Sequence, residues 1–193
     1  MDRFALCFTL LTASEGGFTA DPEDPGNWTG GHKGAGTLRG TKWGVSAAAF
    51  PSLDIAALTE AQAAAIYRAL YWTRAGCDLL PGFVAYFTFD AAVTCGAGQA
   101  VRFLQRAVGA REDGTFGPLT LAAVRRQAAT PEDADRVAEE MLAQRTLFMA
   151  GLATWPTFGL GWSRRLFRLP FQAFRLLPAQ AAVLPVTSNA AAH

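Results

Sequence analysis

The stretch Ser14-Glu15-Gly16-Gly17-Phe18 decides how the N-terminal part of this 193-residue chain is interpreted. Residues 3–14 place apolar side chains at roughly helical spacing, which predicts a helix. The two glycines favour a helix stop, because glycine tolerates the left-handed conformation that ends helices. Glu15 would then lie where the negative end of the helix dipole disfavours another negative charge, and we expect a raised pKa there. A carboxylate in this unfavourable position indicates a catalytic acid.

A long loop is predicted after this stretch. Prolines and glycines recur through residues 19–46 and exclude a regular helix. Two aspartates, Asp21 and Asp24, fall in its Pro-bounded first part. We expect a small β-hairpin in this loop, with its second strand near Thr41–Val45, and a mobile insertion around Gly30–Gly40. His32 lies in that insertion and is expected to be solvated.

The remainder of the chain reads as helical. Thr59 and Gln62 fit a capping box that starts a helix over residues 60–75. Further helices are expected at 83–93, 99–108 and 118–127. Thr130 as N-cap and Pro131 at the first helical position predict a last helix that runs to Met149. The expected fold class is therefore mainly α, a helical bundle with one small β-hairpin near an active-site cleft.

Composition limits the function classes. Apolar residues make up 51% of the chain, which supplies a sizeable core, and a net charge of +1 gives no general case for nucleic acid as a partner. Three widely spaced cysteines and two histidines match no metal motif, so we expect buried free thiols, a reducing compartment, no metal and no cofactor. We expect neither a secretory signal nor a membrane span.

The loop carries the residues that glycosidic bond cleavage requires. Such cleavage needs a protonated carboxylic acid near the leaving oxygen and a second group that stabilises positive charge or positions water. Glu15 supplies the acid. Asp24 lies nine residues further on, with Asp21 as its competitor, and Thr41 can hold a water. From the residues alone, acids in such a loop are more often turn formers.

A family resemblance strengthens this interpretation. The run Glu15–Gly26 and the element Thr41-Lys42-Trp43-Gly44-Val45-Ser46 resemble the glycoside hydrolase family 108 N-acetylmuramidases, lysozyme-like enzymes found as phage endolysins and as export-linked bacterial proteins. In that family the glutamate of the Glu-Gly-Gly-aromatic motif is catalytic, which implies this role for Glu15. Three later segments also match the family in order: 89–93, 103–120 and 158–165.

The resemblance implies an α+β lysozyme-like fold and a peptidoglycan hydrolase. Residues 1–95 would form the catalytic part, residues 96–168 a helical peptidoglycan-binding part packed on it, and residues 169–193 a partly disordered tail. The bond cleaved would be the β-1,4 linkage between N-acetylmuramic acid and N-acetylglucosamine. The protein, expected to be a monomer, would be made in the cytoplasm. A holin or export system would release it to the cell wall or periplasm.

Some site residues remain alternatives. Asn27–Gly40 separates the Asp-Pro-Gly turn from the threonine strand, so Thr29 competes with Thr41 for the water, and Thr41 is preferred beside Trp43-Gly44. The substrate-contact candidates are Asp21, Trp43, Tyr71, Tyr86 and Asp90. Aromatic residues at helical spacing are more often core residues, and Asp90 in an apolar helix is either a cleft residue or a buried anchor, the reading we favour.

The C-terminal region departs from the family pattern. From Trp155 onward the chain has four arginines and no acids, and Arg164–Arg175 is basic and aromatic. It would either bind an anionic membrane surface or pack on the body, and Pro170 is expected to break any long helix there. Alternative functions are a lytic transglycosylase, a non-catalytic peptidoglycan-binding or phage structural protein, and a membrane-active lytic protein.

Overall fold

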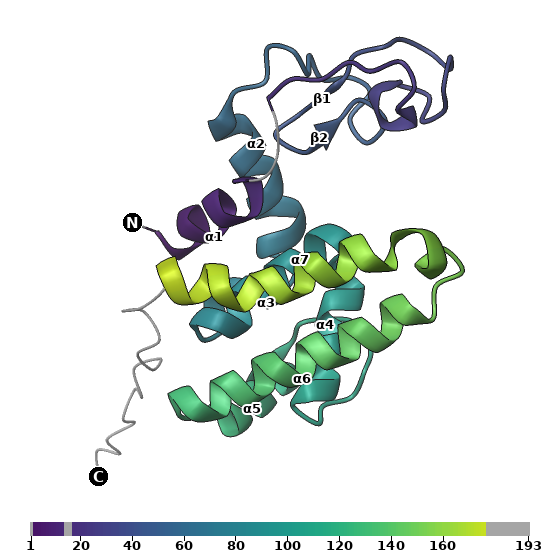
Figure 1. Cartoon of the computed structure of the whole chain (residues 1–193). Coiled ribbons are helices and arrows are strands. Elements are labelled where there is room, and N and C mark those ends of the chain that lie inside the picture. The colour runs from purple at the N-terminus through teal and green to yellow at the C-terminus, as the bar shows by residue number, and fades with distance from the viewer. Residues whose placement is uncertain (1, 14–16, 177–193) are drawn as a thin grey trace. The chain divides into compact units, whose positions relative to one another are not determined.

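The computed structural model describes residues 2–13 and 17–176 (Figure 1). Within these residues the fold is mainly α with one two-stranded antiparallel sheet, which confirms the predicted fold class. Two compact units divide the chain, residues 1–69 and 70–193. The helices are α1 Arg3–Thr12, α2 Glu60–Tyr67, α3 Gly82–Cys95, α4 Ala97–Ala107, α5 Pro118–Gln127, α6 Pro131–Ala150 and α7 Trp155–Leu176.

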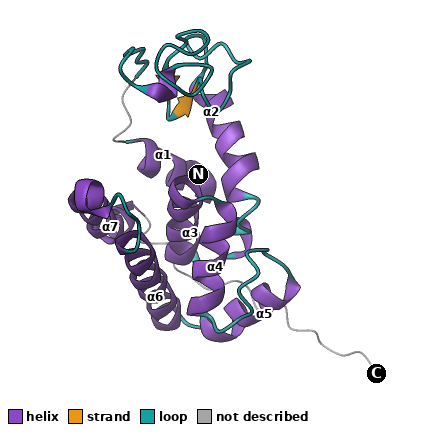
Figure 2. Cartoon of the chain, turned by 90° about the vertical axis from the view of Figure 1, so that its right-hand side faces the viewer, coloured by secondary structure: helices purple, strands orange, loops and turns teal. Residues whose placement is uncertain are grey.

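The first unit joins α1 and α2 through a long loop that contains the sheet (Figure 2). The strands are β1, Thr41–Lys42, and β2, Val45–Ser46, and Thr41 pairs with Ser46. The segment predicted as the second strand is therefore the hairpin itself, because Trp43 and Gly44 both have positive φ and turn the chain. A short 3₁₀ turn, η1 Pro25–Asn27, precedes it.

Helix α2 starts as the sequence predicts. The Thr59 side chain accepts from the backbone N–H of Gln62, and the Gln62 side chain accepts from the backbone N–H of Thr59. The expected helix over 60–75 does not continue in α geometry, however. It passes at Arg68 into a π-helical turn, η2 Arg68–Trp72, and the 3₁₀ turn η3 Cys77–Leu79 follows. Such π-turns are uncommon and frequently mark functional sites.

The second unit is built around α3, which is buried along most of its length. Phe89 packs edge-on against Trp72 with ring centroids 5.4 Å apart, and neither side chain is exposed. Helices α4, α6 and α7 all pack on α3, and α7 lies beside α6 (Figure 1). This arrangement explains why α3 shows no polar face: it has protein on several sides.

Local start signals also fix α6. Thr130 and Asp133 form a reciprocal capping box, and Pro131 occupies the first turn, where a missing N–H costs nothing. The helix ends at Ala150, one residue beyond the expected Met149, and Gly151 is its C-cap.

Helix α7 corrects the prediction for Pro170. The helix continues through this proline to Leu176, although proline removes one backbone hydrogen bond. Buried side chains on both sides of it, Leu166, Leu169 and Ala173, hold the two halves on the body. Tertiary packing therefore overrides the local preference of proline for a helix end.

The cysteines lie as expected in the core, with one exception. Cys7 and Cys77 are buried free thiols, whereas Cys95 is half-buried. Burial raises the pKa of the Cys7 thiol to about 12, so it stays protonated near neutral pH. Among residues 2–13 and 17–176, no cluster of three potential metal ligands occurs, and no helix is long and apolar enough to cross a membrane.

Candidate functional site

The centre of the candidate site is a pair of hydrogen bonds that closes the loop of the first unit. The N–H of Thr19 donates to the carbonyl of Thr41 at 2.9 Å, and the N–H of Thr41 donates to the carbonyl of Thr19 at 2.8 Å. This isolated bridge brings the chain just after Glu15 alongside the start of β1. Gly40 is required next to it, because its φ is 83° and an added Cβ would lie 2.3 Å from the Thr19 carbonyl oxygen.

Asn27 is the hub of this loop, and sequence reasoning missed it. Its side chain is fully buried and its amide nitrogen donates to the carbonyl of Asp21 at 3.0 Å. Its backbone carbonyl accepts from Arg39 and Gly40. Its importance follows from its burial in an otherwise polar loop, and the sequence does not show that burial. Asn27 thereby fixes the spacing between the Asp21–Asp24 segment and β1.

The hydroxyl of Thr41 has a defined hydrogen-bond role. It donates to the side-chain oxygen of Asn27 at 2.7 Å. The Asn27 amide cannot be reversed, since its nitrogen must face the Asp21 carbonyl. The Thr41 proton is therefore committed, and its oxygen can only accept from a further partner. A water donating to Thr41 would have its own lone pairs directed elsewhere, which is the orientation that a nucleophilic water requires.

Asp21 and Asp24 are both exposed and both cap local turns. One carboxylate oxygen of Asp21 accepts from the N–H of Glu23 at 2.9 Å. One carboxylate oxygen of Asp24 accepts from the N–H of Gly26 at 2.8 Å and starts η1. Each bond uses a single oxygen, so the other remains available to a ligand. The structure thus gives each aspartate a turn-forming role and leaves a catalytic role compatible with it.

Trp43 has a strained conformation in the hairpin turn. Its φ is 53°, and among the described residues it is the sole non-glycine residue with positive φ. With Gly44 at φ 72° it forms the two-residue turn in which glycine or asparagine is usual. The strain costs on the order of 1–3 kcal/mol. Its indole N–H is buried and finds no acceptor within 2–13 and 17–176. Strain and an unpaired donor together favour a functional reason for tryptophan here.

Glu15, the predicted acid, lies outside the described residues, as do Ser14 and Gly16. Helix α1 ends at Thr12, with Ala13 as its C-cap. The described chain resumes at Gly17, two residues before the Thr19–Thr41 bridge.

The competing residues Thr29 and His32 belong to a hydrogen-bonded loop. The Thr29 hydroxyl accepts from the N–H of Thr37 at 2.8 Å, and the Thr29 backbone N–H donates to the Thr37 carbonyl. His32 is exposed. The expected insertion at 30–40 is thus closed by its own backbone pairing. Thr29 serves that closure, which favours Thr41 for the water.

Three further candidates lie in the second unit and have packing roles. Tyr86 is 0% exposed, and its hydroxyl donates to Gln172 at 3.3 Å, so its ring offers no face to a sugar. Tyr71 is half-buried in the π-turn. The Asp90 side chain is 1% exposed and forms ion pairs with Arg145 at 2.6 Å and Arg165 at 2.7 Å. Asp90 is therefore the buried anchor, with no oxygen directed at solvent.

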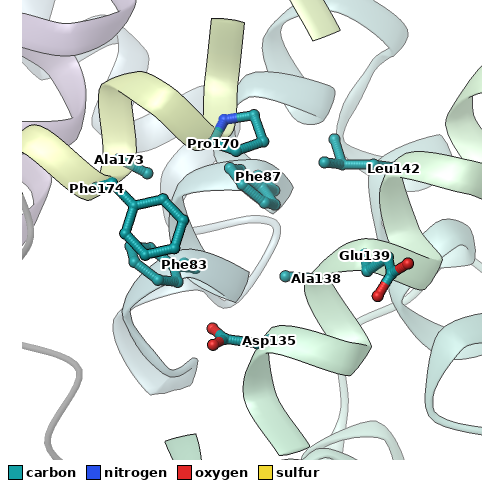
Figure 3. Close-up of a pocket in the computed structure, with 9 residues that line it drawn as sticks. All are labelled: Phe83, Phe87, Asp135, Ala138, Glu139, Leu142, Pro170, Ala173 and Phe174. Carbon is teal, nitrogen blue, oxygen red and sulfur yellow. The ribbon is translucent and has the colours of Figure 1, made fainter. Parts of the chain in front are cut away.

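The second unit also contains an apolar pocket of about 220 Å³ between α3, α6 and α7 (Figure 3). Phe83 and Phe174 both line it and pack against each other, with ring centroids 5.2 Å apart. Asp135 and Glu139 stand at its α6 side, and burial raises the pKa of Asp135 above its usual range. Its lining is mostly apolar and suits an apolar group.

Comparisons with known proteins identify the family of the chain. Residues 8–96 match the family described as glycosyl hydrolase 108, and residues 99–167 match a predicted peptidoglycan domain. The solved structure of SagA from Brucella abortus is 34% identical to this chain. That match covers 93% of this chain and 98% of SagA, with a TM-score of 0.73. The comparison with curated proteins gave no match.

Proposed function

The chain belongs to the glycosyl hydrolase 108 family and carries a peptidoglycan domain, and from this premise we propose that it is an N-acetylmuramidase. Family membership gives it a peptidoglycan hydrolase function of the lysozyme-like kind. The finer proposal is that it hydrolyses the β-1,4 bond between N-acetylmuramic acid and N-acetylglucosamine. The phage or bacterial origin of the chain does not enter this proposal.

Glu15 acts as the general acid in this mechanism. It protonates the glycosidic oxygen as the bond breaks and positive charge develops on the sugar ring. Asp24 stabilises that charge with the carboxylate oxygen that does not cap η1, and Asp21 is the alternative. Thr41 accepts a hydrogen bond from the attacking water, and a second group takes up the water proton as the new bond forms.

One observation carries the proposal: the Thr41 hydroxyl is held as an acceptor next to the segment that follows the Glu15 motif. The bond to Asn27 orients the hydroxyl, and the bridge to Thr19 ties β1 to that segment. Trp43 adjoins Thr41 and provides a ring for stacking on a sugar.

The test is digestion of purified peptidoglycan, with mass spectrometry of the released muropeptides. Glu15→Gln is expected to lower the rate of release by about 10²–10⁴-fold, the contribution of a general acid. Glu23→Gln is the matched control: the same chemical change in the same loop, at a residue whose carboxylate forms an exposed ion pair with Lys33. Full activity of Glu15→Gln would refute the proposal.

The same digest separates the alternatives. Products with reducing muramic acid ends support hydrolysis, whereas 1,6-anhydro ends would identify a lytic transglycosylase. Binding to peptidoglycan without soluble products would identify a non-catalytic binding or structural protein. Asp21→Asn and Asp24→Asn keep the oxygen that each turn needs and remove the charge. The variant that loses more activity therefore identifies the charge-stabilising residue.

We also propose a route by which the enzyme reaches the cell wall. An enzyme made in the cytoplasm needs a holin or an export system to reach peptidoglycan, and expression with and without a co-expressed holin tests this by lysis of the culture. We propose that it acts as a monomer.

A further inference from the structure

Helix α7 presents a row of large apolar side chains to solvent. Leu160, Phe167, Phe171 and Phe174 are 67%, 73%, 67% and 65% exposed. They are separated by seven, four and three residues, so they lie along one face of the helix. The opposite face, with Leu166, Leu169 and Ala173, is buried on the body. We call the exposed row the aromatic ridge. Exposed phenylalanines in such a row are costly in water and indicate a binding surface.

Arginines follow one flank of the aromatic ridge. Arg164 and Arg168 are exposed, are four residues apart, and have no salt-bridge partner within residues 2–13 and 17–176. Arg165 differs, because it turns toward the body and pairs with Asp90. No Asp or Glu occurs from Trp155 to the end of the chain. The exposed part of α7 is thus cationic and aromatic, without a compensating negative charge of its own.

Acidic groups occur on the other flank of the ridge. Asp135 and Glu139 of α6 line the pocket together with Pro170, Ala173 and Phe174 of α7 (Figure 3). By helical spacing, Pro170 and Ala173 face away from Arg164 and Arg168. The ridge therefore separates the two signs of charge, and its arginine flank is free to meet an anionic surface.

We propose that the aromatic ridge and its arginine flank bind the surface of an anionic lipid bilayer. Phenylalanine rings insert into the region between headgroups and acyl chains, and arginines pair with lipid phosphates. The ridge fits a flat partner, because its exposed side chains lie in a row along one helix.

Membrane binding would place the enzyme beside its polymer. Peptidoglycan lies against the outer surface of the cytoplasmic membrane, so an enzyme held at that surface meets newly made glycan. This inference goes beyond the proposed hydrolase activity and does not depend on it. The ridge is distant in sequence from Glu15, Asp24 and Thr41, and a vesicle assay contains no peptidoglycan, so it reports membrane binding separately from hydrolysis.

The experiment is flotation of the full chain in a density gradient at low salt. The vesicles contain phosphatidylcholine alone or phosphatidylcholine with about 30% phosphatidylglycerol. The wild-type chain is expected to float with the anionic vesicles and to stay behind with the neutral ones. Arg164→Gln/Arg168→Gln should weaken binding roughly thirtyfold, since each arginine near an anionic surface contributes about 1 kcal/mol.

The apolar part is tested by Phe167→Ser/Phe171→Ser, which should weaken binding about tenfold or more because two rings no longer enter the interface. The matched control is Leu119→Ser/Leu147→Ser, which removes two apolar side chains that are 84% and 69% exposed on α5 and α6. This control should float like the wild type. Circular dichroism and the melting temperature of each variant establish that it is folded.

Three outcomes would overturn the proposal. The first is equal binding to neutral and anionic vesicles, or none to either. The second is binding by Phe167→Ser/Phe171→Ser that equals the wild type while the fold is intact. The third is sedimentation of the wild type as a dimer that this variant dissociates, without vesicle binding, which would make the ridge a contact between two copies.

Discussion

The buried carboxylate of Asp90 provides the sharpest test of how the second unit is held together. One oxygen accepts from Arg145 Nη1 at 2.6 Å, and the other accepts from Arg165 Nη2 at 2.7 Å and Nε at 3.2 Å. Arg145 also donates to the hydroxyl of Thr94 at 2.8 Å, and its side chain is 2% exposed. Asp90 therefore connects α3 to both α6 and α7.

We predict that Asp90→Asn lowers the free energy of unfolding by about 3–5 kcal/mol, because it leaves the buried Arg145 charge without a counter-charge. Arg165→Gln should cost only about 1 kcal/mol, since the Arg165 side chain is 34% exposed and water solvates the change. The double variant Asp90→Leu/Arg145→Met removes both buried charges and should lie within about 2 kcal/mol of the wild type.

The assay is urea unfolding monitored by circular dichroism at about 10–15 °C, near the temperature of maximum stability. The slope of the unfolding free energy against urea concentration is compared among the variants. A loss of 3–5 kcal/mol is a large part of the roughly 5–15 kcal/mol that holds a domain together. Arg165→Gln stays folded and so keeps the comparison meaningful. A cost below about 1 kcal/mol for Asp90→Asn would refute the anchor role.

Activity of the folded protein separates the anchor from a cleft residue. With the anchor role, Arg165→Gln and the double variant digest peptidoglycan at the wild-type rate below their melting temperatures. A fall in rate with unchanged stability would return Asp90 to the substrate site. The control is Arg136→Gln, which removes an exposed arginine of α6, the helix that also carries Arg145; Arg136 pairs with Asp133.

Two further perturbations test local features. Gly76→Ala should lower the free energy of unfolding in urea by more than about 2 kcal/mol, because φ is 69° and the new Cβ would lie 2.2 Å from the Phe116 ring. The control Gly109→Ala, where φ is 65° and the space is open, should cost only about 1 kcal/mol. Equal costs would refute the steric argument. The Gln105 hydrogen bond lowers the pKa of Asp113, so ionised Asp113 stabilises the fold at neutral pH, and this stabilisation is lost as the pH falls through the lowered pKa. Burial raises the pKa of Asp135, so ionised Asp135 destabilises the fold at neutral pH. Asp113→Asn should therefore reduce the fall in melting temperature as the pH is lowered, and Asp135→Asn should raise the melting temperature at neutral pH. Melting temperatures that change in the opposite direction would contradict these two predictions.

The sequence predicted those parts of the fold that depend on neighbours within one turn. Thr59 with Gln62, and Thr130 with Asp133, specify helix starts through bonds that span three residues, and Pro131 supports the second start. Pro170 was mispredicted for the complementary reason. Its effect depends on Leu166, Leu169 and Ala173 packing on helices far away in sequence, and no local pattern reports that packing.

The site was predictable in its motif but not in its support. Asp21, Asp24 and Thr41 were identified because they flank the Glu15 motif in a known order. Asn27, which ties two of them together, carries no sequence signal, since its importance lies in burial and in the carbonyl it faces. Tyr86 had a spacing equally suitable for a groove and a core, and only its burial separates the two.

The turns at Asp21 and Asp24 require a hydrogen-bond acceptor oxygen at each position, but they do not require a negative charge. Each turn needs one acceptor, and asparagine would supply it without bringing charge into a loop that also holds Glu23. Glu23 balances its charge against Lys33, whereas neither aspartate has a cation within salt-bridge distance among the described residues. Uncompensated carboxylates raise the negative potential of the loop, and a negative potential stabilises the cationic sugar ring of glycoside cleavage. The loop's charge therefore has a chemical use that its geometry alone does not require.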